Sequence, residues 1–407
     1  MFHLILFVIF PFALLGLQWV LYSKSVKFIQ ELELEVDIEK NLIYFIRAVF
    51  IYFLAAALAT LILRFDSGGS AIYKYTIFYP LIVWVISSFV ISIFFIFRDS
   101  VLVLTKTFSR IINIQKDPTP KVDLVERRKF LKAGSLTSFG IVALPLTTFS
   151  YAAIAAKSEP MIEHVNIKLN SLPDSLNGLR IVQLSDIHTN QFIGQKDVER
   201  VTELVNREEP DIVLVTGDFV SNSPKYIPNC AAGLRNISAK YGVFGCLGNH
   251  DYYTNAAEVR NQMEGIGINL LVNSSENLEI NGTRLSIAGI DDLWVGKPDY
   301  SAALRDTDLS SLVILMSHNP DAFPSIARHN VGLTLSGHTH GGQIGLRLLG
   351  NHYSFVNLVT PYVMGEFSID KSKLYVNRGI GTVGPPIRLN STPEITIFRL
   401  ESSDVTV

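Results

Sequence analysis

The sequence predicts an α/β protein with two stacked mixed sheets covered by helices, preceded by an all-α membrane-spanning region. In the second half of the chain, short apolar runs typical of buried strands alternate with helix-like and turn-like segments. Polar residues follow five of these runs, at the point where each strand would end. The first 156 residues are instead rich in long apolar stretches. We therefore expect a transmembrane region at 1–156 and a water-facing domain at 157–407.

The length and the net charge of the chain limit its possible functions. A chain of 407 residues has room for two or three domains. Its formal net charge of −2 at pH 7 is typical neither of a general nucleic-acid binder nor of a strongly acidic protein, so we expect no nucleic-acid partner.

Four apolar runs predict a multi-pass membrane protein. The runs at 1–22, 42–63 and 77–97 are long enough to span a bilayer, and a milder run at 133–156 contains Pro145. Arg47 lies near the start of the second run, where a long side chain reaches the interface at little cost.

The distribution of Lys and Arg predicts the orientation in a bacterial inner or plasma membrane. Nine of them lie in 98–132 and three in 23–41, whereas 65–76 carries only Lys74. Since cytoplasmic loops carry the excess of positive charge, we expect both Lys/Arg-rich loops inside and the second domain on the non-cytoplasmic side.

A second feature of this region agrees with export. Arg127-Arg128-Lys129 resembles a twin-arginine export signal, although Glu126 stands where such signals have Ser or Thr. The alternative is that these are positive flanking charges of the fourth span. Ala153-Ile154-Ala155 could be a processing site, but we expect the domain to stay attached.

Individual elements of the second domain follow from periodicity and turn signals. Residues 195–207 have the apolar spacing of an amphipathic helix, and Pro210 separates this helix from a strand at 212–216. Asn281-Gly282 predicts a two-residue hairpin between 278–280 and 283–285. The runs 374–376 and 395–400 supply further strands. Cys230 and Cys246 could pair in an oxidising compartment or remain free and buried.

Metal-binding residue types follow the strand-like runs 180–185, 212–216, 243–247, 312–316 and 331–336. These residues are Asp186 and His188, Asp218, Asn249 with His250 and Asp251, His318, and His338 with His340. In open α/β sheets, ligands bind outside the carboxyl ends of the strands. Carboxylate, amide and imidazole groups are ligands of divalent cations. Unrelated polar turn residues would explain any one of these places, but not all five together.

The ordered set of motifs resembles the calcineurin-like metallophosphoesterase family, in particular its membrane-anchored bacterial branch, over about residues 160–400. The resemblance implies a four-layer α/β/β/α sandwich with two metal ions at one edge. It assigns one ion to Asp186, His188, His340 and Asp218, and the other to Asn249, His318, His338 and the same Asp218. Mixed oxygen and nitrogen ligands favour Mn²⁺, Fe or Zn²⁺.

The same resemblance implies hydrolysis of a phosphomonoester, phosphodiester or pyrophosphate bond by a water that bridges the two ions. We expect His250 to protonate the leaving oxygen, with Asp251 holding its ring. The alternative is that His250 only binds phosphate. Arg388 is expected to contact the substrate phosphate through its fork of donors, although a surface arginine is the default interpretation.

The apolar stretch 344–358 leaves the substrate class open. It is either a rim that admits the acyl chains of a lipid-linked substrate or a lid or core segment. One lipid-linked nucleotide cleaved by this family, UDP-2,3-diacylglucosamine, is cleaved at the cytoplasmic face, against the expected orientation. Two other functions remain: a metal-binding sensor without turnover, and a transporter, which the lack of paired charges and repeats in the spans disfavours.

Overall fold

The computed structural model describes residues 10–32, 34–62, 73–111, 143–170, 172–221, 223–308 and 311–403. The chain divides into two compact units, Met1–Ala153 and Ile154–Val407. Each unit is described by itself.

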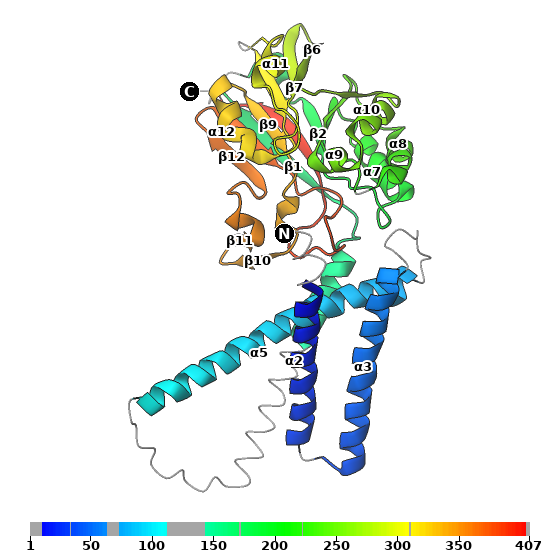
Figure 1. Ribbon diagram of the computed structural model, residues 1–407. Helices are drawn as coiled ribbons and strands as arrows, with labels where there is room; N and C mark the ends of the chain where they lie inside the picture. Colours follow the sequence, from blue (N-terminus) through cyan, green and yellow to red (C-terminus); the bar gives the residue numbers. More distant parts are fainter. Residues whose placement is uncertain are drawn as a thin grey trace. The chain divides into compact units, whose positions relative to one another are not determined.

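The first unit is helical (Figure 1). Its helices are α2 (Phe10–Glu31), α3 (Val36–Ile62) and α5 (Tyr79–Ile111), and a π-helical turn, η2 (Lys74–Phe78), leads into α5. Polar contacts join α2 to α5: the indole N–H of Trp84 donates to Oε1 of Gln18 over 3.0 Å. Such contacts satisfy polar groups on otherwise apolar helices.

Within the described residues, two helices are long and apolar enough to cross a membrane, Val36–Thr60 and Lys74–Phe108. Only 6% and 28% of their most apolar stretches are buried, whereas the core helix of a soluble protein is mostly buried. The expected span at 1–22 is described from Phe10, and its helix continues to Glu31, through part of the expected 23–41 loop. Of the expected fourth span, the structure describes the apolar helix Ala143–Ala155, while Arg127 and Arg128 lie outside the described residues.

Among the described residues of this unit, an ion pair joins two of the helices. Lys24 of α2 pairs with Asp99 of α5. Both residues lie just beyond the expected spans, so the pair does not place a charge pair inside them. Arg47 of α3 donates through Nε to the hydroxyl of Tyr22 over 2.8 Å, which gives its charge a polar partner.

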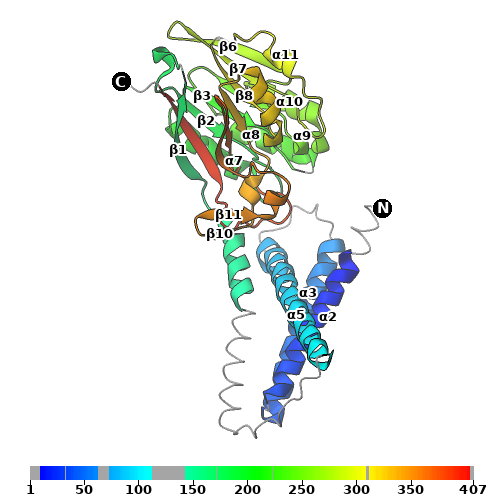
Figure 2. The ribbon, with the colours of Figure 1, turned by 90° about the vertical axis from the view of Figure 1, so that its left-hand side faces the viewer.

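The second unit contains two six-stranded mixed sheets and a separate hairpin (Figures 1 and 2). The first sheet has the order β1 (Met161–Leu169), β14 (Glu394–Ser402), β2 (Arg180–Leu184), β3 (Ile212–Thr216), β4 (Val243–Cys246), β5 (Ile268–Leu270). The second has the order β12 (Gly365–Ile369), β13 (Ser372–Val376), β9 (Leu333–Ser336), β8 (Leu312–Met316), β7 (Thr283–Gly289), β6 (Ser274–Ile280). The hairpin is β10 (Gly345–Leu348) with β11 (Asn351–Ser354).

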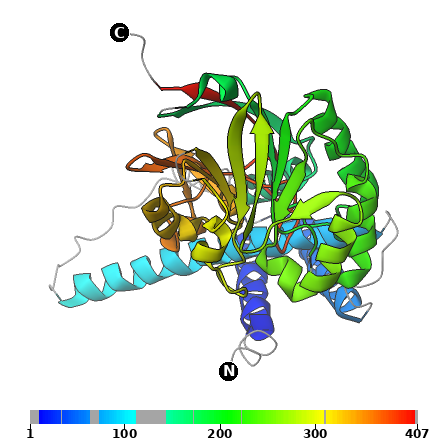
Figure 3. The ribbon, with the colours of Figure 1, turned by 90° about the horizontal axis from the view of Figure 1, so that it is seen from above.

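Apolar clusters hold together the layers of this unit, whose sheets and helices Figure 3 shows from above. One packs helices against the first sheet, for example Val198 and Leu234 on Val213. The second fills the space between the sheets, with Leu214 from the first sheet and Ile287 and Leu335 from the second. The third packs helices on the second sheet. The outer helices are α7 (Gln195–Arg207), α8 (Ile227–Leu234), α9 (Asn249–Thr254), α10 (Ala256–Glu264), α11 (Tyr300–Leu304) and α12 (Phe323–Ile326). The predicted four-layer α/β/β/α sandwich is confirmed.

Several predicted elements match closely, and others were missed. Helix α7 and strands β3 and β8 have the expected bounds, and Asn281-Gly282 joins β6 to β7. The sequence did not predict that β14 would lie between β1 and β2, parallel to the first and antiparallel to the second. Cys230 and Cys246 are free and buried, so they do not form the disulfide considered above.

Candidate metal centre

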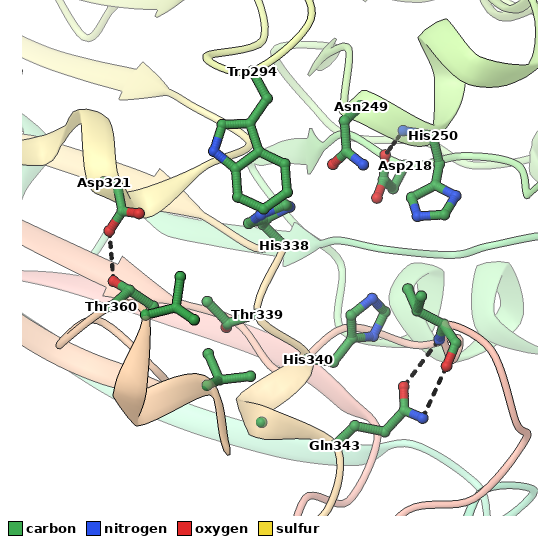
Figure 4. A pocket seen from close by; sticks show the side chains of 14 residues that line it. Asp218, Asn249, His250, Trp294, Asp321, His338, Thr339, His340, Gln343 and Thr360 are labelled. Atoms are coloured by element: carbon green, nitrogen blue, oxygen red, sulfur yellow. Dashed lines mark hydrogen bonds between the residues drawn. The ribbon is translucent and has the colours of Figure 1, made fainter. Parts of the chain in front are cut away.

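The polar strand ends meet because of the parallel register. Strands β2, β3 and β4 run parallel in one sheet, and β7, β8 and β9 run parallel in the other. Their carboxyl ends therefore lie at one edge of each sheet. The loops after β2, β3, β8 and β9 and the start of α9 bring all seven expected metal ligands to this edge; Figure 4 labels Asp218, Asn249, His338 and His340.

The first cluster consists of Asp186, His188 and His340, whose ligand atoms lie within 4.8 Å of one another. Nε2 of His340 lies 3.2 Å from Oδ1 of Asp186 and 3.1 Å from Nε2 of His188. The main-chain N–H of His338 donates to both oxygens of Asp186, over 3.1 and 2.9 Å. All three side chains of the cluster are buried, an unusual arrangement for titratable groups without a cation.

The second cluster consists of Asp218, His318 and His338. Nε2 of His318 lies 3.2 Å from Oδ2 of Asp218 and 3.2 Å from Nδ1 of His338. Asn249, at the start of α9, lines the same pocket as Asp218 and His338.

Asp218 joins the two clusters. Its Oδ2 atom lies 3.3 Å from Nε2 of His188 and 3.2 Å from Nε2 of His318, so one oxygen faces both sets. This Oδ2 atom and Oδ1 of Asn249 are buried, and neither has a hydrogen-bond partner among the described residues. A buried acceptor without a donor is costly, and a divalent cation removes that cost. The donor set therefore fits two divalent cations that share Asp218.

The backbone at this edge is held in an uncommon conformation. Asp186, His188, Asp218, His338 and His340 all have positive φ values, between 50° and 71°. A non-glycine residue in the left-handed region costs on the order of 1–3 kcal/mol and persists only where the surrounding structure imposes it. The strain is concentrated at the residues that carry the candidate ligands.

Two glycines permit the close approach of the loops around Asp218. A Cβ atom on Gly217 would lie 2.8 Å from Nδ1 of His318, and a Cβ atom on Gly248 would lie 2.3 Å from Oδ1 of Asp218. Both distances are shorter than real side-chain contacts allow, so a larger residue would displace the ligands.

Two histidines are oriented by partners that the sequence did not indicate. Nδ1 of His318 lies 2.8 Å from the carbonyl oxygen of Thr216. Since a carbonyl only accepts, Nδ1 carries the hydrogen and Nε2 faces the cluster. Nδ1 of His188 lies 2.5 Å from the hydroxyl of Ser221, which can donate or accept, so this contact orients the ring without choosing its tautomer. Such partners hold the rings in place for metal binding, and the carbonyl also fixes the tautomer of His318.

The four histidines of the two clusters have pKa values shifted in opposite directions. Burial opposes protonation of His188 and His318, but the adjacent carboxylates of Asp186 and Asp218 outweigh it and raise their pKa values to about 9 and about 10. Burial and neighbouring imidazolium charge lower the pKa of His338 to about 4, and burial outweighs the charge of Asp186 at His340, whose pKa falls to about 3. In the metal-free site, one histidine of each cluster is therefore charged near neutral pH.

His250 lies at the edge of the pocket, in edge-to-face contact with His188 at 4.8 Å between ring centroids. Its main-chain N–H donates to Oδ1 of Asp218 over 2.8 Å. Its buried Nδ1 atom has no hydrogen-bond partner among the described residues. Burial and the charge of His188 lower the pKa of the imidazole.

Asp251 does not hold the ring of His250, and that expectation is corrected. Its carboxylate accepts the main-chain N–H groups of Asp218, Gly248 and Val220, over 2.9, 3.0 and 3.3 Å. In the described part of the chain, no hydrogen bond joins this carboxylate to His250. Burial and the charge of Asp218 raise its pKa to about 7. Asp251 thus orders the loop that carries Asp218.

The expected position of Arg388 is also wrong. The side chain is buried instead of exposed, and it does not line the pocket. Its guanidinium donates to the main-chain carbonyls of Ser391, Arg378 and Gly379 over 2.9, 2.9 and 3.0 Å, and also to that of Gly381. These bonds give Arg388 a structural role next to His340. Nη2 of Arg388 lies 3.4 Å from Nδ1 of that histidine.

A cavity of about 410 Å³ opens beside the two clusters. One end is formed by Asp218, Asn249 and the histidines, and the other by valines, Thr360 and one carboxylate, Asp321 (Figure 4). The sequence did not single out Trp294, whose indole lies edge-on to His338 at 4.3 Å between ring centroids. It also missed Gln343, whose amide bonds to the main chain of Val383 and so fixes one wall.

Comparisons with known proteins identify relatives of this chain. A family model described as calcineurin-like phosphoesterase matches residues 179–342. The chain is 34% identical over 293 residues to the uncharacterized metallophosphoesterase YkuE of Bacillus subtilis, which covers 69% of this chain and 99% of that protein. It is 34% identical over 270 residues to a transmembrane protein with metallophosphoesterase domain of Danio rerio, covering 62% of this chain and 60% of that protein. A solved structure, TT1561 of Thermus thermophilus, aligns with a TM-score of 0.34 and 12% identity over 50% of this chain and 90% of that one.

Proposed function

Because the chain belongs to the calcineurin-like metallophosphoesterase family, we propose that it is a membrane-anchored phosphoesterase that uses two metal ions sharing Asp218. It is a metal-dependent hydrolase of phosphate esters. The observation that carries the proposal is the position of Oδ2 of Asp218, within 3.3 Å of a histidine from each cluster. Our proposed ligands are Asp186, His188 and His340 on one side of Asp218, and Asn249, His318 and His338 on the other.

When bound, two divalent cations supply positive charge to a phosphate group and lower the pKa of water. Manganese, iron and zinc suit the mixed oxygen and nitrogen ligands. The residues of the chain orient the ligands. The main-chain N–H of His250 and the loop ordered by Asp251 orient Asp218, and the cavity excludes part of the bulk water.

Hydrolysis breaks the bond between phosphorus and the leaving oxygen and forms a bond between phosphorus and a water oxygen. The attacking water loses one proton to solvent, and the leaving oxygen must receive one, so the overall reaction is balanced. The ring of His250 faces the cavity next to Asp218 and His188, and we propose that it donates this proton. The negative charge of a bound phosphate would then offset the burial that lowers the pKa of this imidazole. In this assignment the imidazole acts without help from Asp251, because that carboxylate bonds to the main chain.

The helices α3 and α5 support the proposed membrane anchor, since both are long, apolar and largely unburied. We propose that residues 1–156 form a multi-pass anchor and that 157–407 form the catalytic domain on the non-cytoplasmic side. A reporter enzyme that is active only in the cytoplasm, fused after Val407, should then be inactive. Activity of that reporter would reverse the orientation without changing the proposed chemistry.

The enzymatic proposal is tested with full-length protein purified in detergent. After removal of metal with a chelator, Mn²⁺ should restore hydrolysis of bis-p-nitrophenyl phosphate, and the variant Asp218→Asn should remain inactive. A metal-loaded protein that binds inorganic phosphate but never turns over would support the sensor alternative instead. The physiological substrate that we propose is a phosphomonoester, phosphodiester or pyrophosphate, and the surface described next bears on whether it is lipid-linked.

A further inference from the structure

The hairpin β10–β11 and the 3₁₀ turn that follows it, η8 (Phe355–Leu358), carry an unusual concentration of exposed apolar side chains. We call this surface the apolar lip, formed by Leu346, Leu348, Leu349, Tyr353, Phe355 and Leu358. The hairpin forms a two-stranded sheet of its own, apart from the two large sheets (Figures 1 and 2). A two-stranded hairpin gains little stability in water, so its apolar face needs another partner.

The residue at the tip of the hairpin, Leu349, does not stabilise the folded chain. Leu349 has φ 51° and Gly350 has φ 83°, as in the tight turns that normally carry Asn-Gly. The equivalent tip between β6 and β7 is Asn281-Gly282. A leucine is strained in this conformation, and at 94% exposure Leu349 recovers none of that cost by packing within the chain.

The lip is continuous with the wall of the catalytic cavity. In a 3₁₀ helix, residues three apart lie on the same edge. One edge of η8 presents Phe355 and Leu358, which are 83% and 84% exposed. The next edge presents Val356, and Val359 follows it three residues on; both line the cavity beside the metal clusters. An apolar chain lying along the lip would therefore enter the cavity from its mouth.

We propose that the apolar lip inserts into the surface of a lipid bilayer and presents the cavity to phosphate esters carried by membrane lipids. The inference rests on the proposed function. The segment 341–365 contains no acidic residue, and its one formal charge is Arg347, a composition suited to anionic headgroups. Leucine, phenylalanine and tyrosine are the residues that bury in such an interface.

A bilayer is favoured over a protein partner because the same chain carries the membrane-crossing helices α3 and α5. In addition, residues 156–160 are all that separates the apolar helix Ala143–Ala155 from β1. Extended, this link spans roughly 20 Å, so on the proposed topology the domain stays within reach of the membrane surface.

Site-directed spin labelling of the full-length protein in phosphatidylcholine–phosphatidylglycerol vesicles tests the insertion. Leu349→Cys provides the label site, because Cys230 and Cys246 are buried and react poorly. Asn281→Cys, at the other hairpin tip, is the matched control. We expect the Leu349→Cys label to collide several-fold less with a water-soluble nickel complex, and more with oxygen, than the control. Equal access at both tips would overturn the proposal, as would shielding of Leu349→Cys from both reagents, which would indicate a protein partner or a second copy.

Enzyme activity tests whether the lip presents the cavity to phosphate esters of membrane lipids. The double variant Leu349→Asn and Leu358→Asn changes no cavity residue, and asparagine tolerates the tip conformation. It should hydrolyse bis-p-nitrophenyl phosphate at the wild-type rate but a p-nitrophenyl ester of phosphatidic acid in vesicles several-fold more slowly. Equal loss on both substrates, equal retention of both, or a wild-type protein that ignores the lipid ester would each overturn it. Absence of all hydrolysis would refute the proposed function, while the spin-label result would still decide the insertion.

Discussion

The main-chain N–H of His250 donates to Oδ1 of Asp218 over 2.8 Å, so the proposed proton donor orients the shared carboxylate through its backbone and not its side chain. Oδ2 of Asp218 is left to face both clusters. The two functions of His250 are therefore separable by mutation.

His250→Ala keeps this main-chain bond and removes the imidazole. We expect both metal ions to remain bound and kcat to fall by about 10²-fold or more, which is the usual loss for a general acid. Metal content by mass spectrometry and kcat with bis-p-nitrophenyl phosphate measure the two effects. A variant that loses its metal would show that the ring is itself a ligand.

Asp218→Asn should remove metal from both clusters, since one oxygen faces the two of them. The measurement is metal stoichiometry after dialysis at fixed free Mn²⁺. Asp321→Asn is the matched control, because Asp321 lines the same cavity but belongs to neither cluster. The control should keep two ions; loss of both ions from it as well would mean that general negative charge, and not the shared oxygen, retains the metal.

Metal binding should release protons near neutral pH. With pKa values raised to about 9 and about 10, His188 and His318 are protonated in the metal-free protein, whereas His338 and His340 are neutral. Metal requires neutral imidazole, so affinity should rise between pH 6 and 9. A raised folded-state pKa stabilises the metal-free fold below pH 6.5, and this contribution is lost as pH rises through 9 to 10. Calorimetry in buffers of different ionisation enthalpy should report about two protons released; enthalpies independent of the buffer would contradict this charge assignment.

Arg388 should matter for stability and not for substrate affinity. Arg388→Leu leaves several buried carbonyls, including those of Arg378 and Gly379, without their donor. We expect the free energy of unfolding to fall by about 2–3 kcal/mol with KM nearly unchanged, provided that metal is retained. Thermal unfolding and steady-state kinetics decide, with the exposed Arg347→Leu as control. A large rise in KM without a loss of stability would restore Arg388 as a substrate-binding residue.

Much of the fold and of the candidate site was predictable, because strand periodicity places each polar motif at a carboxyl end and parallel register brings those ends together. The error at Asp251 has a local cause. Helix α9 begins at Asn249, so consecutive side chains point about 100° apart and a carboxylate next to His250 in sequence turns away from its ring. Trp294 and Gln343 belong to loops whose conformations depend on tertiary packing, and no local pattern indicates that they reach the cavity.

Anomalous X-ray diffraction from crystals of the Mn²⁺-loaded protein tests the central claim most directly. Two peaks are predicted, about 3.5–4 Å apart, with Oδ2 of Asp218 between them, His188 and His340 beside one and His318 and His338 beside the other. A single peak, or two peaks that do not share Asp218, would contradict a dinuclear centre at this edge of the sheets.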